Sequence, residues 1–355
     1  MKKLFGVLLV VAVLVCRVSA EDLKVLSPAD PAIRYVGRFT DDYQFGWSGS
    51  QIETIFTGSE ISATLELSGG SKVGITAVVD GKENFILVIP EKSTYPIASG
   101  LAAGEKHHIL LFRRSEGALS GKGVVRFGGF GASTDGAFSA PAPRQHKLLV
   151  LGDSITCGYA NEAAAQQANN TVENENGYLS YAAIAARSLD ADLMMVCWSG
   201  KGMYRNIGAE NYLEDTIPDL FDRTLPASAT PAWNHSQFVP DVIAINLGTN
   251  DAGTNSGKEP LKKEDYVDAA CRLIKRLRAD APGSKIILSI GPMRYDPVQS
   301  WLSEIAAQFD NVSVLIYSKY AGSDDQGGKS FHPSVKKHRE MADELAAKVR
   351  EITGW

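Results

Sequence analysis

The spacing of apolar residues divides the chain into two regions with different predicted structure. Up to about residue 143, short segments alternate apolar and polar side chains, as strands with one buried face do. Seven such strands are predicted, at 34–39, 51–56, 61–67, 74–79, 85–89, 107–112 and 123–127. Asp80-Gly81, between two of them, is a typical hairpin-turn pair. Many short strands separated by turn residues predict a β-sandwich.

From about residue 146 onward, apolar strands alternate with helical patterns. Strands are predicted at 147–151, 193–197, 241–247, 285–290 and 312–317, and helices at 178–189, 264–279, 298–309 and 333–352. This alternation predicts an α/β domain with a parallel five-stranded sheet and helices on both faces. Pro333 is predicted at the first position of the last helix. The Pro-containing linker 140–144 then separates a β domain at 21–143 from an α/β domain at 144–355.

Residues 1–20 have the pattern of a secretory signal peptide. Two lysines precede an apolar run, Leu4 to Val15, which is too short to span a bilayer, and Val18-Ser19-Ala20 is a plausible cleavage site. The alternative is a lipoprotein anchored through Cys16, for which the preceding Val15 is a poor fit. No later stretch is apolar enough to span a membrane. We therefore expect export, to the periplasm or the medium.

Composition removes several classes of function. The chain has 355 residues, an apolar content of 44% and a formal net charge of −5. No basic stripe is present, which argues against a nucleic-acid partner. Beyond the signal, Cys157, Cys197 and Cys271 lie in apolar stretches and are predicted to be buried free thiols. Since no pair has zinc-ligand spacing, neither a metal nor a cofactor is expected.

Candidate chemistry gathers at the ends of predicted elements. Ser154 follows the strand Leu148–Leu151, Gly200 follows the next strand, Asn250 follows the third, and His332 precedes the last helix. Because parallel strands end at one edge of a sheet, these residues are expected to meet there. A serine and a histidine can serve as nucleophile and base, while a glycine N–H and an asparagine amide can stabilise an oxyanion.

These four blocks, in this order, resemble those of the SGNH (GDSL-like) hydrolases. The N-terminal β domain, the wording GDSITCGY and the Ser-Gly-Lys-Gly of the second block narrow the resemblance to carbohydrate esterase family 2. This likeness implies a jelly-roll N-terminal domain and removal of acetyl groups from polysaccharides such as xylan or glucomannan. It also implies that Ser154 is the nucleophile and His332 the base. The N–H groups of Ser154 and Gly200, with the Asn250 side chain, would form the oxyanion hole.

The sequence departs from the usual SGNH pattern beside the histidine. Most members carry an aspartate three residues before it, where this chain has Lys329. Some members of carbohydrate esterase family 2 use a backbone carbonyl instead, so we expect Phe331 or a nearby loop residue to offer one. Asp324 and Asp325 are the competing candidates, since the loop could fold one of them back.

Other interpretations stay open. Tyr159, Trp198 and Tyr295 are candidate sugar contacts, although Trp198 fits the core equally well. A lipid or thioester hydrolase would want an apolar acyl tunnel, and a carbohydrate-binding protein would keep the same residues as a vestigial site. The expected partner is an acetylated polysaccharide or oligosaccharide. The stretch 323–330 resembles a phosphate-binding P-loop but lacks its leading glycine, and no G-x-S-x-G elbow of an α/β-hydrolase surrounds Ser154.

Overall fold

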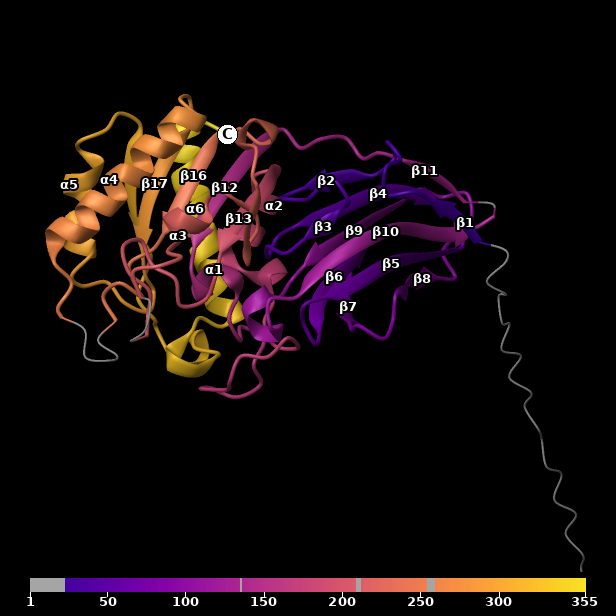
Figure 1. Cartoon of the computed structure of the whole chain (residues 1–355), viewed down its shortest axis with the longest axis horizontal. Helices are drawn as coiled ribbons and strands as arrows, with labels where there is room; N and C mark the ends of the chain where they lie inside the picture. The colour runs from indigo at the N-terminus through magenta and orange to yellow at the C-terminus, as the bar shows by residue number, and fades with distance from the viewer. Residues whose placement is uncertain (1–22, 135, 209–211, 254–258) are drawn as a thin grey trace, which may run out of the picture.

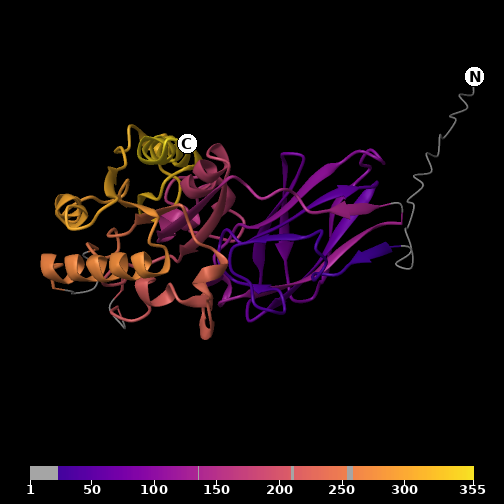
Figure 2. The ribbon, with the colours of Figure 1, turned by 90° about the horizontal axis from the view of Figure 1, so that it is seen from above.

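The computed structural model describes residues 23–134, 136–208, 212–253 and 259–355. Two domains lie side by side, one built from antiparallel sheets and one from a parallel sheet flanked by helices (Figures 1 and 2). The predicted signal peptide, Cys16 included, lies outside the described residues. Within the described ranges, no helix is long and apolar enough to cross a membrane.

The N-terminal domain is a β-sandwich, as predicted. One sheet has the order β1 (Leu23–Leu26), β10 (Val124–Ser133), β5 (Glu60–Ser68), β8 (Thr94–Ser99), with β3 (Gln44–Phe45) also on β10. The other has the order β11 (Ala137–Ser139), β4 (Gln51–Thr57), β9 (His107–Arg113), β6 (Val73–Val79), β7 (Lys82–Val88), with β2 (Arg34–Val36) also on β4. The two inner faces enclose an apolar core. Asp80 and Gly81 adopt φ values of 50° and 80° between β6 and β7, which confirms the predicted hairpin turn.

Four strands of this domain were not predicted, namely β1, β3, β8 and β11. In β8 the reason is chemical, because Pro96 interrupts the strand pattern. Proline lacks the N–H that a ladder needs and is tolerated on an edge strand, which is where β8 lies. The other three strands contain four residues or fewer and carry too little alternation to be recognised.

The C-terminal domain has the predicted five-stranded parallel sheet, in the order β13 (Ala191–Cys197), β12 (His146–Gly152), β16 (Val242–Asn246), β17 (Lys285–Ile290), β18 (Val312–Ile316). Successive residues of β12 point to opposite faces: Leu149 packs with α3 (Ile217–Leu220), α4 (Lys263–Asp280) and α5 (Gln299–Ala306). Leu148 packs on the other face, with α1 (Ser154–Cys157), α2 (Tyr181–Ser188) and α6 (Val335–Thr353). The remaining short elements are η1 (Gly117–Ser120), η2 (Gly177–Leu179), β14 (Arg223–Leu225), β15 (Ser228–Ala232), η3 (His235–Gln237), η4 (Ser323–Asp325) and η5 (Lys329–Phe331).

The predicted start of the last helix was wrong. Helix α6 begins at Val335, and Ser334 is its N-cap, with a side chain that accepts from the Lys337 N–H at 3.4 Å. Serine satisfies a backbone donor at this position, whereas proline cannot, so Pro333 lies outside the helix. His332 therefore lies in the loop that enters α6, not in the helix.

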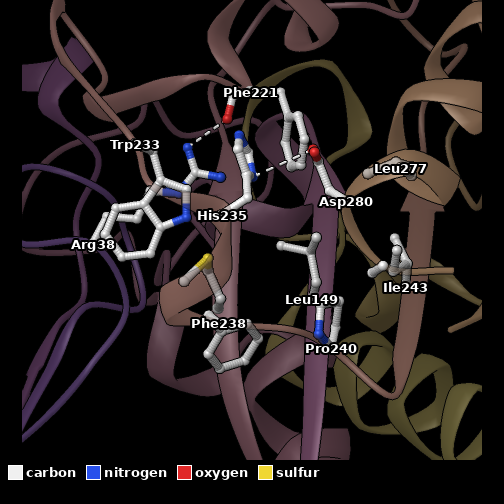
Figure 3. A pocket seen from close by; sticks show the side chains of 12 residues that line it. Arg38, Leu149, Phe221, Trp233, His235, Phe238, Pro240, Ile243, Leu277 and Asp280 are labelled. Carbon is white, nitrogen blue, oxygen red and sulfur yellow. Dashed lines mark hydrogen bonds and ion pairs between the residues drawn. The ribbon is translucent and has the colours of Figure 1, made fainter. Parts of the chain in front are cut away.

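Arg38 joins the two domains at a boundary distant from the sheet edge. It comes from the β domain and is 1% exposed. Its Nη1 donates to the carbonyls of Phe221 and Arg223 at 2.7 and 2.8 Å, and its guanidinium lies 5.3 Å from the ring of Trp233. Figure 3 shows this guanidinium beside Trp233, with the bond to Phe221 dashed. The space left there is about 10 Å³, the size of one water, so the contact is a domain anchor.

A cluster of charged side chains packs the linker against both domains. Arg34 of β2 and Arg144 of the linker both pair with Glu53 of β4 and with Asp192 of β13. Burial by itself would raise the pKa of Glu53, but hydrogen bonds from His108 and Arg144 lower it to about 2. The linker is therefore held by a network that includes buried carboxylates, and the domains are packed together.

The three described cysteines are free. Cys157 and Cys197 are buried as predicted, whereas Cys271 is only half-buried on α4. Among the described residues, no group of three His, Cys, Asp or Glu side chains could hold a metal ion.

Candidate active site

A cavity of about 610 Å³ opens at the carboxyl edge of the parallel sheet. Its lining includes all four residues that the sequence placed at element ends, Ser154, Gly200, Asn250 and His332. The topology explains this meeting, because β12, β13 and β16 are adjacent and parallel, so the loops that follow them leave the same edge. His332 reaches the edge from the loop before α6.

Ser154 lies at the first turn of α1, directly after β12. The Asp153 side chain caps this turn by accepting the Ile155 N–H at 2.9 Å. Gly152 permits the tight turn, because a Cβ there would lie 1.9 Å from the Thr156 hydroxyl oxygen. The sequence Gly-Asp-Ser therefore folds locally so that the Ser154 side chain faces the cavity.

His332 contacts Ser154 on one side and a backbone carbonyl on the other. Its Nε2 lies 2.8 Å from Ser154 Oγ, and its Nδ1 lies 2.5 Å from the carbonyl oxygen of Lys329. A carbonyl can only accept, so Nδ1 carries the proton and Nε2 is left to accept from the serine hydroxyl. Burial lowers the pKa of His332 to about 4, with the carbonyl bond opposing this shift, so the imidazole is neutral at pH 7.

Neither competing aspartate reaches this histidine. Asp325 accepts from the Ala321 and Gly322 N–H groups and pairs with Lys336 at 2.6 Å. Asp324 is exposed and pairs with the same lysine at 3.0 Å. Both carboxylates thus hold the loop before α6, while the backbone of Lys329 faces the imidazole.

The stretch that resembles a P-loop forms this histidine loop. Gly327 donates its N–H to the His332 carbonyl at 2.8 Å. A Cβ on Gly328 would lie 2.5 Å from the Cβ of Ala160, so glycine is needed for the loop to approach the turn at Tyr159 and Ala160. Ser330 and Phe331 adopt left-handed φ values of 60° and 64°. The glycines of this loop therefore serve backbone packing beside the cavity.

Gly200 lies in a tight turn between Trp198 and Lys201. The Lys201 N–H donates to the Trp198 carbonyl at 3.2 Å, and Gly200 has φ = 81°, the value that favours glycine at the third position of a type II turn. The Gly200 carbonyl accepts from the Ile207 N–H at 2.8 Å. The turn is thus hydrogen-bonded internally and to the segment that follows it.

Asn250 faces this turn from the end of β16. Its Nδ2 donates to the Lys201 carbonyl at 2.8 Å and to an Asp153 carboxylate oxygen at 3.3 Å. Burial raises the pKa of Asp153 to about 7, and the charge of Asp251 adds to the effect. The Asn250 N–H that bonds to Asp153 makes the longer and weaker hydrogen bond, so this N–H is the one that can more easily donate to a substrate oxygen instead.

Comparison with known proteins identifies the family. Residues 35–143 match the family described as carbohydrate esterase 2 N-terminal, and residues 150–340 match the GDSL-like lipase/acylhydrolase family. A solved family two carbohydrate esterase from Clostridium thermocellum, in complex with cellohexaose, is 35% identical with a TM-score of 0.83. The alignment covers 91% of this chain and 99% of that one. The chain belongs to carbohydrate esterase family 2. The resemblance drawn from the four sequence blocks is thereby confirmed.

Two curated proteins are also similar to this family 2 protein. Cellulase/esterase CelE of Acetivibrio thermocellus is 36% identical over 95% of this chain, which spans only 41% of the length of CelE. An acetylxylan esterase / glucomannan deacetylase of Cellvibrio japonicus is 29% identical over 93% of this chain and 91% of its own length. A solved family two carbohydrate esterase from the same organism is 28% identical with a TM-score of 0.82, over 94% of this chain and 98% of that one.

The three aromatic residues predicted to contact sugar in this family 2 protein lie in different places. Tyr159 lines the cavity and stacks on His332, with ring centroids 3.9 Å apart. Trp198 is not part of the cavity lining and packs edge-on against Trp47 of the β domain at 6.5 Å. Tyr295 also lies outside the lining and donates its hydroxyl to the Tyr317 carbonyl at 3.1 Å. Trp198 and Tyr295 thus lie outside this cavity and are used in packing, and sugar contact by them stays a prediction.

Among the other residues that line the cavity, four large side chains were not predicted as part of the site. Phe331 is 55% exposed beside His332, and Ile207, Met293 and Arg294 come from irregular segments. Such segments have no periodicity from which a direction could be predicted. Only the adjacency of Phe331 to His332 offered a signal.

Proposed function

We propose that this protein is an exported carbohydrate O-acetyl esterase that removes acetyl groups from plant polysaccharides such as xylan or glucomannan through a serine acyl-enzyme. The observation that carries the proposal is the 2.8 Å contact between Ser154 Oγ and His332 Nε2 at the mouth of the cavity. Family membership supports it, as do the names of the Cellvibrio japonicus relatives.

In the first half-reaction, Ser154 Oγ attacks the acetyl carbonyl carbon while His332 Nε2 takes the hydroxyl proton. The resulting imidazolium then gives this proton to the sugar oxygen as the ester bond breaks, which leaves an acetyl group on Ser154. The contact distance of 2.8 Å already suits the proton transfer.

Negative charge develops on the carbonyl oxygen during attack. The N–H groups of Ser154 and Gly200 and the Asn250 amide are the proposed donors to it. Fixed dipoles of this kind act strongly where water is excluded, and losing one typically costs about 10² to 10³ in rate. Asn250 joins them by exchanging its longer bond, to Asp153, for the substrate oxygen.

In the second half-reaction, water attacks the acetyl carbonyl carbon while His332 Nε2 takes a proton from it. The imidazolium then returns this proton to Ser154 Oγ as the acyl bond breaks, which releases acetate and restores the serine. The Lys329 carbonyl keeps the imidazole in the required tautomer in both halves. A neutral carbonyl stabilises imidazolium less than a carboxylate does, so this arrangement supplies orientation more than charge.

The decisive experiment measures acetate release from acetylated xylan, acetylated glucomannan and acetylated chitin, with Ser154→Ala as control. We expect release from at least one plant polysaccharide and none from the variant. A series of p-nitrophenyl esters tests acyl size, for which activity should fall steeply from acetyl to butyryl. Equal rates on acetyl and octanoyl esters would instead identify a lipid-type hydrolase. Saccharide binding without hydrolysis would identify a binding protein.

Export is tested separately. Expression of the full chain in a bacterial host should yield a mature protein that begins after Ala20 and is found outside the cytoplasm. Mass spectrometry of the N-terminal peptide measures the cleavage site. A lipid-modified Cys16 at the N-terminus would establish the anchored alternative.

A further inference from the structure

The β domain reaches the rim of the cavity through one short segment. Strand β9 ends at Arg113, and the following residues lead into η1. Along this segment the Arg114 carbonyl accepts from the Gly177 N–H at 2.8 Å, and the Arg114 Nε donates to the Glu175 carbonyl at 2.9 Å. The segment is thus bonded to the catalytic domain directly before it presents Glu116.

Glu116 is 2% exposed and contacts the turn that contains Gly200. Its Oε2 accepts from the Ser199 backbone N–H at 2.8 Å and from the Cys157 thiol at 3.8 Å. Ser199 directly precedes Gly200, and Cys157 belongs to the same short helix as Ser154. One carboxylate of the β domain therefore touches two of the three segments that supply the proposed oxyanion donors.

The contact fixes one peptide plane. The peptide between Trp198 and Ser199 is held at both ends, because its carbonyl accepts the Lys201 N–H at 3.2 Å and its N–H donates to Glu116. With this plane fixed, the direction of the next peptide depends only on the φ and ψ of Ser199. That next peptide carries the Gly200 N–H.

A second buried carboxyl group supports the first. Glu175 is fully buried, accepts the Glu116 backbone N–H at 2.6 Å and is hydrogen-bonded to Asn170. Burial raises the pKa of both groups, and the charge of Glu116 raises that of Glu175 further. Glu175 thus holds the backbone of Glu116 in place.

We propose that Glu116, a residue of the β domain, is a positioning residue that fixes the turn at Ser199 so that the Gly200 N–H faces the reacting carbonyl oxygen. The proposal rests on the proposed esterase function and gives the β domain a part in the active site. Glu116 touches neither substrate nor reacting atoms, so its effect should appear in kcat and not in KM.

The test compares three substitutions on p-nitrophenyl acetate. Glu116→Gln keeps an oxygen acceptor of the same reach and should retain kcat within about threefold. Glu116→Asp keeps the charge but is one methylene too short, and Glu116→Ala removes the acceptor. Both should lower kcat about 10- to 100-fold with KM within about twofold, less than the loss of a whole oxyanion donor. Wild-type kcat in Glu116→Asp, or an equal loss in Glu116→Gln, would overturn the proposal.

A matched control separates positioning from stability. Arg34→Ala removes another contact between the domains, the pair with Asp192, which does not touch the Gly200 turn. It should lower Tm while kcat stays unchanged. If Glu116→Ala does not fold, the Asp and Gln variants still decide the question. A fall in kcat for Arg34→Ala as large as that for Glu116→Asp would show that general loosening is the cause, and the proposal would fail.

A second assay does not depend on acetyl specificity. A p-nitrophenyl alkylphosphonate forms a tetrahedral adduct on the serine, and intact mass spectrometry follows its rate of formation. Glu116→Asp should slow this reaction about tenfold or more even if the protein prefers an acyl group other than acetyl, because the phosphoryl oxygen uses the same donors. An unchanged rate of phosphonylation in Glu116→Asp would refute the positioning role of Glu116 but not the proposed esterase function. If the wild-type protein hydrolyses no ester and forms no adduct on Ser154, both proposals are refuted.

Discussion

The catalytic edge of the sheet and the domain boundary at Arg38 are both buried polar clusters, yet they differ in how their hydrogen bonds end. At the edge, Ser154 Oγ bonds to the imidazole that is proposed to take its proton, and the Asn250 amide has a long bond to Asp153 that a substrate oxygen can replace. Both lie beside a cavity of about 610 Å³. At the boundary, Arg38 donates to two carbonyls and lies between aromatic rings, with about 10 Å³ of space. Buried polarity alone therefore does not locate a site. The site is located by a hydrogen-bonded nucleophile and base, Ser154 and His332, that line an open cavity.

The comparison leads to opposite expectations for mutation. Changes at the catalytic edge should lower kcat and leave stability nearly intact, because the edge residues contact a cavity instead of dense packing. Changes at the boundary should lower stability and leave kcat intact. A residue that changed both quantities equally would blur the distinction.

The largest effect is expected for His332→Ala. Loss of the base should lower kcat on p-nitrophenyl acetate by about 10³ to 10⁴, with little change in Tm. His338→Asn is the matched control, because His338 is also a buried histidine and its Nδ1 accepts the Tyr181 N–H at 3.2 Å. An asparagine oxygen can replace that acceptor, so kcat should stay within a few-fold. Equal losses in the two variants would contradict the assignment of His332 as base.

The pH dependence gives an intermediate effect. Because burial lowers the pKa of His332 to about 4, the base stays unprotonated well below its ordinary value of 6.5. The acid limb of kcat/KM should therefore lie near pH 4, and activity at pH 5 should remain close to its plateau. A limb near pH 6.5 would show that the free enzyme exposes this imidazole to water.

The same shift has a consequence for stability. Below pH 6.5 the histidines of the unfolded chain bind protons that the folded chain excludes from His332 and His338, whose pKa values are about 4 and about 3. The unfolding free energy should thus fall as the pH decreases from 6.5 toward 4. Chemical denaturation at several pH values measures this, and His338→Asn should flatten the slope.

Arg38→Met should affect stability without affecting catalysis. The change removes the donor to two buried carbonyls, of which that of Arg223 keeps the Trp47 indole N–H at 3.2 Å. Leaving the Phe221 carbonyl without this donor costs about 1 to 3 kcal/mol, and the cation is also lost from the ring faces. Denaturant unfolding should show a loss of about 3 kcal/mol, with kcat within about twofold of wild type. A large fall in kcat would mean that the two clusters communicate.

The smallest effects are expected beside the base. Lys329→Ala should be nearly silent, because the exposed side chain is lost and the carbonyl that His332 uses remains. Asp324→Ala and Asp325→Ala should keep most of the activity, although the second removes contacts within the loop. A thousand-fold loss of kcat in either aspartate variant would reveal a carboxylate that acts on the imidazole.

Much of this architecture could be predicted from the sequence because its signals are local. The apolar runs of the five parallel strands are long enough to be recognised, and Ser154, Gly200 and Asn250 follow three of them directly. Once the strands are parallel, their ends must share an edge, so these residues had to meet.

Other features could not be predicted, since they depend on backbone atoms or on tertiary contacts. The acceptor for His332 is a carbonyl oxygen, which every residue carries and no motif marks. Glu116 contacts Ser199 from another domain, and no local sequence pattern distinguishes it from a surface glutamate. The packing of Trp198 and Tyr295 could not be predicted either, because proximity in sequence to a site residue does not give the direction of a side chain.

The carbonyl of Lys329 makes the orientation of the base robust to point mutation. A carboxylate in its place could be lost by a single codon change, whereas a backbone oxygen survives every substitution at its own position. Proline is the exception, since the Lys329 N–H also donates to the Ala168 carbonyl at 2.8 Å. The position sensitive to substitution is therefore Gly328, where any side chain would clash with Ala160 and Tyr159 and displace the loop. A saturation library across this loop should tolerate nearly all changes at 329 and almost none at 328.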